Sequence, residues 1–156
     1  MSPLVQVFSA ISAILVWVIA WYFGTAQEVS SIWWRSDTFA HGLLVLPISG
    51  WLAWRSKDRL VGLSIQPALV MALPILAAGF GWLLGELASV ASVTHVALAF
   101  VLIFSLVGVL GFRLARPLAF PILFLLFGIP IGEFLLPVMM EHHWPREAFG
   151  FAIALQ

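Results

Sequence analysis

The feature that most constrains the fold of this chain is a series of apolar runs, each about as long as a helix that crosses a lipid bilayer. We place these runs at residues 4–23, 38–54, 67–84, 90–111 and 117–140. A helix needs about 20 mostly apolar residues to cross roughly 30 Å of hydrocarbon. Only 9% of the 156 residues are charged, against roughly 25% in a typical soluble domain. The sequence therefore predicts an all-α protein, a polytopic transmembrane helix bundle of about five spans in a single domain, residues 1–156.

The last run differs from the others because proline and glycine interrupt it. The interruptions are Pro121, Gly128, Pro130, Gly132 and Pro137. Such breaks are tolerated at membrane depth where the freed backbone groups are buried in protein or line a cavity. The pattern fits either one kinked helix or a half-helix followed by a re-entrant turn.

Arginine and lysine counts predict the orientation of the bundle. If the N-terminus is cytoplasmic, the inner loops hold Arg55, Lys57, Arg59, Arg113 and Arg116. The outer side then holds only Arg35 and Arg146. Positive residues favour the cytoplasmic side, so we expect a multi-pass membrane protein with a cytoplasmic N-terminus and with its polar groups gathered on the outer face of the membrane. Between the first two runs, the polar stretch with Trp33 and Trp34 is expected to lie along the membrane surface.

Asp37 and His41 stand at the start of the second run and are the first candidate functional residues. Ser36 or Asp37 could cap a helix that begins there. A spacing of four places Asp37 and His41 on one helical face, where an ionised carboxylate would favour a protonated imidazole. The structural alternatives are that Asp37 only caps and that His41 only lines an interface. Ionisable groups within spans are costly, however, and are functional by default.

Glu133, in the broken last run, is the third candidate functional residue. Its carboxylate could cap freed N–H groups or line a cavity. The nearby Glu141-His142-His143 does not predict a metal site, because adjacent histidines on a helix point about 100° apart and no further ligand is apparent. We predict no metal and no cofactor. A net charge of zero offers no basic surface for nucleic acid.

Two stretches of the sequence resemble the bacterial exosortase family. The first block is residues 34–48, Trp-Arg-Ser-Asp-Thr-Phe-Ala-His-Gly-Leu-Leu-Val-Leu-Pro-Ile, in a span that closes with Trp54-Arg55. The second block is residues 116–133, Arg-Pro-Leu-Ala-Phe-Pro-Ile-Leu-Phe-Leu-Leu-Phe-Gly-Ile-Pro-Ile-Gly-Glu. The isolated His-Gly pair is a weak signal, whereas both blocks at this separation are a moderately specific one. The sequence looks most like the exosortase A branch.

The resemblance implies a cysteine protease or transpeptidase of the bacterial inner membrane, in which the outer, polar face of the bundle would be periplasmic. Its partners would be exported proteins with a C-terminal Pro-Glu-Pro sorting signal, an apolar helix and a basic tail, processed at the outer face in connection with exopolysaccharide production. The family's proposed catalytic Cys, Arg and His lie downstream of every residue here, so no catalytic residue is assigned to this chain. His41 matches the early His-Gly position instead. Because the sequence contains no cysteine, we expect this chain to be the N-terminal portion of such an enzyme and to be inactive by itself. A truncated gene, a frameshift or a fragment would each account for it.

Two other classes of function stay open. A haem-bearing or quinone-facing membrane anchor could use His41 and His95 as paired axial ligands from different helices. A transporter fragment could use Glu133 on a proton or substrate path, although no repeat relates the two halves of the chain.

Overall fold

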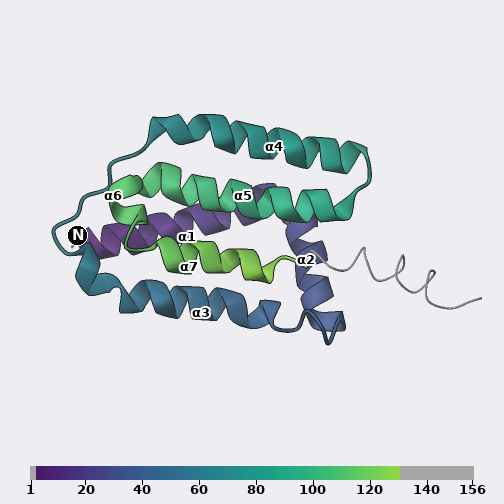
Figure 1. Cartoon of the computed structure of the whole chain (residues 1–156), viewed down its shortest axis with the longest axis horizontal. Helices are drawn as coiled ribbons and strands as arrows, with labels where there is room; N and C mark the ends of the chain where they lie inside the picture. The colour runs from purple at the N-terminus through teal and green to yellow at the C-terminus, as the bar shows by residue number, and fades with distance from the viewer. Residues whose placement is uncertain (1–2, 131–156) are drawn as a thin grey trace, which may run out of the picture.

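The computed structural model describes residues 3–130, and every regular element in that range is a helix. The longer helices are α1 (Pro3–Trp21), α2 (Phe23–Arg35), α3 (Gly42–Arg55), α4 (Ala72–Leu87) and α5 (Ala91–Leu110). The shorter ones are η1 (Lys57–Leu60), η2 (Leu69–Met71), α6 (Phe112–Ala115), α7 (Ala119–Phe124) and η3 (Leu125–Gly128). Figure 1 shows α1, α3, α4, α5 and α7 running along one common direction, with α2 crossing one end of them. The predicted all-α membrane bundle is confirmed.

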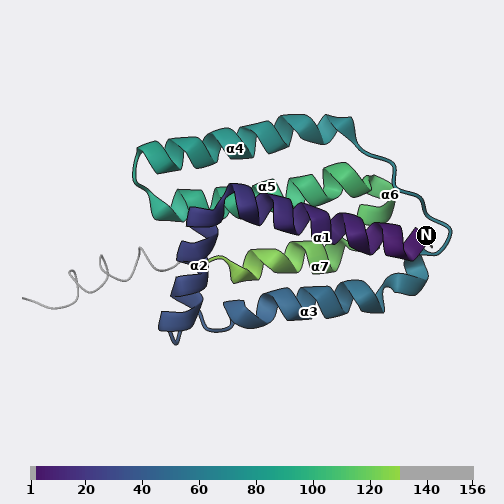
Figure 2. The same cartoon turned by 180° about the vertical axis from the view of Figure 1, so that it is seen from behind.

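Helix α5 lies at the centre of this bundle. It packs against α4 on one side and against α1 on another, and seen from behind, α1 covers the α5 and α7 layer (Figure 2). The core lies where α1, α5, α6 and α7 meet, and its fully buried side chains include Val7, Leu110, Leu114 and Leu118. α4 and α3 flank this core on opposite sides (Figure 1). Most of α4 is left exposed, as suits a helix whose neighbour is lipid.

Within the described residues, three helices are long and apolar enough to cross a membrane, at 4–21, 69–87 and 91–110. These correspond to the first, third and fourth predicted runs, with ends that shift by a few residues. The second run forms a shorter helix than expected, since α3 has 14 residues and is therefore about 21 Å long.

The predicted start of that second helix is wrong. Ser36 follows the last residue of α2, and α3 begins only at Gly42. Between them the backbone makes turns, in which the N–H of Phe39 donates to the carbonyl of Ser36 and the N–H of Gly42 to that of Phe39. Neither Ser36 nor Asp37 therefore caps α3, because the residues that follow them form a non-helical turn and α3 begins only after it.

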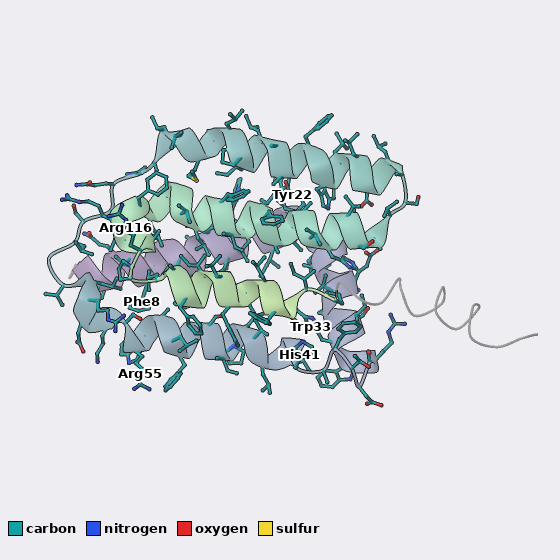
Figure 3. The ribbon with its side chains drawn as sticks, in the orientation of Figure 1. Phe8, Tyr22, Trp33, His41, Arg55 and Arg116 are labelled. Carbon is teal, nitrogen blue, oxygen red and sulfur yellow. The ribbon has the colours of Figure 1, made fainter. Side chains whose placement is uncertain are left out.

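The polar stretch before this turn is itself a helix. The buried face of α2 is formed by Thr25, Val29 and Ile32, at the spacing of one side of a helix. Trp34 is 81% exposed, as expected for a side chain at a membrane surface. Trp33 points the other way, into the bundle (Figure 3).

The broken last run begins as two short helices, α7 and η3. Pro121 lies inside α7, and the helical path ends at Gly128. Residues 131–140 of the predicted span lie outside the described residues, and with them the choice between a kinked helix and a re-entrant turn.

The two ends of the bundle differ in chemistry. Arg55 and Arg116 lie at one end, whereas Trp33 and His41 lie at the other (Figure 3). The Arg55 guanidinium lies 5.3 Å from the ring centre of Trp51, and the Lys57 ammonium 5.0 Å from that of Trp54. Cations stacked on exposed indoles are typical of the headgroup level of a membrane.

Candidate functional site

Trp33 joins the two blocks at the end of the bundle crossed by α2. Its indole Nε1 donates a hydrogen bond of 2.7 Å to the carbonyl of Gly128. Carbon Cζ2 of the ring is 3.3 Å from the position that a Cβ on Gly128 would occupy. On the other side, a Cβ on Gly42 would overlap the same indole. Trp33 therefore fits between two glycines, one at the start of α3 and one at the end of η3.

His41 makes a second link between the same segments. Its Nδ1 lies 3.0 Å from the carbonyl of Thr38, and its Nε2 lies 3.2 Å from the carbonyl of Phe127. A neutral imidazole carries one N–H and can donate to only one of the two carbonyls, whereas an imidazolium can donate to both. His41 and Trp33 thus contact the carbonyls of adjacent residues. We call this group of Trp33, His41, Phe127 and Gly128 the clasp.

Asp37 lies in the turn between α2 and α3, on the way to His41. Its side chain is exposed. Among the described residues, the ion pair within 4.0 Å is the one between His95 and Glu28, and none joins Asp37 to His41. The predicted pairing of Asp37 and His41 on one helical face is therefore absent, because residues 37–41 are turns. Asp37 remains available to solvent or to a bound molecule.

Glu133, the third candidate, lies outside the described residues. The described chain ends with Gly128, Ile129 and Pro130, directly after the clasp, and Pro130 is fully buried. The sequence Glu141-His142-His143 also lies outside. Across residues 3–130, no group of three His, Cys, Asp or Glu side chains is arranged to hold a metal ion.

A cavity of about 420 Å³ lies beside the clasp. Its walls come from α1, α2, α3, α5 and η3, and they include Trp33 and Gly128. His95, on α5, is the most buried ionisable side chain that lines it, with 4% of its surface exposed. His41 does not line it, and both of its ring nitrogens face carbonyls. The structure therefore does not bring His41 and His95 together as a pair of haem ligands.

The clasp connects the two stretches on which the family resemblance depends. The first block runs through His41 and Gly42, and the second through Phe127 and Gly128. The family model described as transmembrane exosortase matches residues 33–147. This chain belongs to the transmembrane exosortase family. No curated protein and no solved structure matches the chain.

The exosortase match begins at Trp33 and takes in α3, α4, α5, α6 and α7. It includes both sides of the clasp, together with His95. Helix α1 and nearly all of α2 precede it. Asp37, His41 and Glu133 all fall inside the match, which does not by itself assign a role to any of them.

Sequence reasoning missed Trp33 and Gly128 as members of the site. Trp33-Trp34 has the composition of an interfacial aromatic pair, and Gly128 was one of several breaks in the last run. The sequence did contain one signal, namely that a glycine follows His41 directly and that the second block also contains a glycine. Both glycines make room for the same indole.

Proposed function

We propose that this chain is the N-terminal membrane portion of an exosortase that processes exported proteins carrying a C-terminal Pro-Glu-Pro sorting signal. The family match over residues 33–147 supports the proposal. In this proposal, the processing of exported proteins takes place at the inner membrane and is linked to exopolysaccharide production. The N-terminus is cytoplasmic and the clasp faces the periplasm, as the five Arg and Lys residues of the opposite end favour.

The observation that carries this proposal is the clasp itself. The first block is held against the second by the Trp33 indole, which packs on Gly42 and donates to the carbonyl of Gly128, and by the contact of His41 Nε2 with the carbonyl of Phe127. The exposed carboxylate of Asp37 lies in the same turn as His41. We assign to Asp37, His41 and Glu133 the binding and positioning of the substrate near its cleavage point. These residues prepare a site and do not perform the bond cleavage.

Cleavage by the chemistry proposed for exosortases needs a thiolate to attack the peptide carbonyl, a His to move the proton and an Arg to stabilise the oxyanion. The sequence contains no cysteine. The sulfur must therefore come from outside these 156 residues. We propose that the chain alone binds a sorting signal and leaves it uncleaved.

The test is co-expression with a secreted reporter protein that ends in a Pro-Glu-Pro signal, an apolar helix and a basic tail. The host should have no exosortase of its own. We expect the uncleaved reporter to co-purify with this chain. A matched reporter with Ala-Ala-Ala in place of Pro-Glu-Pro serves as the control. Equal recovery of both reporters would contradict recognition of the signal, and a cleaved reporter would contradict the inactivity of the isolated chain.

A further inference from the structure

The cavity beside the clasp has apolar walls with a few polar groups at the end where α2 crosses the bundle. Leu15 and Ile19 of α1 line it, as do Leu98 and Leu102 of α5. His95, Gln27 and Ser30 supply its polar side chains. Its volume of about 420 Å³ falls within the range of small-molecule pockets, roughly 300–1,000 Å³. Walls of this kind with few polar groups suit a molecule that is mostly hydrocarbon.

His95 is the unexplained group in this cavity. It is 4% exposed, and its Nε2 has no hydrogen-bond partner among the described residues. Its Nε2 lies at the ion-pair distance of 3.5 Å from Oε2 of Glu28, a side chain that is 64% exposed and is not among the residues that line the cavity. Buried polar atoms in native proteins are nearly always paired, so an unpaired one calls for an explanation. A bound molecule that completes the hydrogen bonding of His95 is one such explanation.

We propose that this cavity binds a neutral lipid with a single chain and a hydroxyl headgroup, such as a long-chain alcohol. The hydroxyl oxygen accepts from the imidazole N–H of His95, and the hydroxyl hydrogen is donated to the carboxylate of Glu28. The hydrocarbon chain lies along Leu98 and Leu102. This proposal concerns a ligand of the membrane portion and does not depend on the sorting function.

The pair of His95 and Glu28 selects the headgroup. One hydroxyl both donates and accepts, which matches an imidazole beside a carboxylate. An ionised fatty acid would bring a second negative charge next to Glu28, and like charges at short distance repel. A plain hydrocarbon, or the apolar face of a protein helix, would leave His95 unpaired at a cost in binding.

The experiment uses the purified chain in phosphatidylcholine nanodiscs and a diazirine analogue of hexadecanol as the photoaffinity probe. We expect mass spectrometry to place the label on α1 and α5 residues that line the cavity. Unlabelled hexadecanol should compete well, and hexadecane and palmitate poorly. Hexadecane that competes as well as hexadecanol, or a label spread over the outer surface of α4, would overturn the proposal.

Variants separate binding from folding. His95→Phe should weaken competition by hexadecanol about fivefold to tenfold, because one hydrogen bond is lost. Leu98→Trp should block labelling by filling the space for the chain. Ser49→Ala removes another buried, unpaired polar atom, from a residue that does not line the cavity, and should leave labelling unchanged. Helix content and gel-filtration profile confirm that each variant is folded.

The variant Glu28→Gln distinguishes a headgroup contact from a purely structural role of His95. A structural role predicts no change in how well palmitate competes relative to hexadecanol. Removing the negative charge should improve competition by palmitate relative to hexadecanol. No change in this ratio would contradict the proposed contact with the headgroup. An apolar transmembrane peptide that displaces the probe where hexadecanol does not would show that the cavity takes a protein helix, which would also overturn the proposal.

Discussion

At the scale of single residues, one indole accounts for how two distant parts of the chain meet. Trp33 and Gly128 are 95 positions apart and share a hydrogen bond of 2.7 Å. Gly128 is buried, so its carbonyl has little access to water as a replacement partner. A lost partner at a buried carbonyl costs more than the bond itself contributes. The clasp should therefore be sensitive to small changes in Trp33.

Trp33→Phe keeps an aromatic ring in place but removes the N–H. We expect it to lower the free energy of unfolding by roughly 1–3 kcal/mol, because the Gly128 carbonyl is left unpaired. The measurement is unfolding in mixed micelles titrated with sodium dodecyl sulfate. The control is Trp34→Phe, at a side chain that is 81% exposed, with an expected change within about 0.5 kcal/mol. Equal effects of the two substitutions would show that the hydrogen bond contributes nothing.

Gly42→Ala tests the steric half of the clasp. The added methyl group would overlap the Trp33 indole, and overpacking of this kind costs roughly 1–3 kcal/mol. Gly50→Ala, in the same helix, meets no atom within 4 Å and should stabilise by up to about 1 kcal/mol through helix propensity. The same micelle titration compares them. The two substitutions should change stability in opposite directions, and a stabilising Gly42→Ala would contradict the observed packing.

At the scale of elements, the entry into α4 depends on the end of α5. The N–H of Ala68 donates to the carbonyl of Gly108 at 2.8 Å, and that of Gln66 to the carbonyl of Leu110 at 3.4 Å. Gly111 ends α5 with a φ of 79°, and a Cβ there would overlap the carbonyl of Gln66. The loop between η1 and η2 is thus held close to the α5 terminus, where any residue other than glycine at position 111 would be strained.

Gly111→Ala should therefore destabilise more than Gly62→Ala. Gly62 has a similar φ of 80° but nothing within 4 Å of its would-be Cβ, so alanine there pays only the left-handed backbone cost of about 1–2 kcal/mol. At position 111, alanine has the same backbone cost and must in addition displace the backbone of Gln66. Thermal unfolding in detergent, followed by circular dichroism, measures both. Indistinguishable melting temperatures would contradict the contact between Gly111 and Gln66.

The same elements show what could be predicted from the sequence. The α4 and α5 helices follow from long apolar runs, because burial in lipid requires an uninterrupted hydrogen-bonded backbone. The start of α3 could not be predicted, since Ser36 and Asp37 have the side chains of a helix cap and yet precede a turn. The inward position of Trp33 depends on a glycine in another part of the chain, which no local pattern contains. His95 was considered only as a possible axial ligand paired with His41, and its proximity to Glu28 follows only from how α2 crosses α5.

At the scale of the whole molecule, the bundle has one cationic end and one end that carries the clasp. Arg55 and Arg116 mark the first, and Trp33 and His41 the second (Figure 3). The proposed function requires the clasp to face the periplasm, where exported proteins emerge. A reporter enzyme that works only outside the cytoplasm should be inactive when fused at Lys57. Activity of that fusion would reverse the proposed orientation.

The most direct measurement of this central claim is the labelling of single cysteines in intact cells, because the chain contains no cysteine of its own. We predict that Asp37→Cys, in the exposed turn before His41, reacts with a membrane-impermeant maleimide added from outside. Arg59→Cys, at the cationic end, should react only after the cells are permeabilised. Labelling of Arg59→Cys in intact cells, with protection of Asp37→Cys, would place the clasp in the cytoplasm and contradict the proposal that it meets exported substrates.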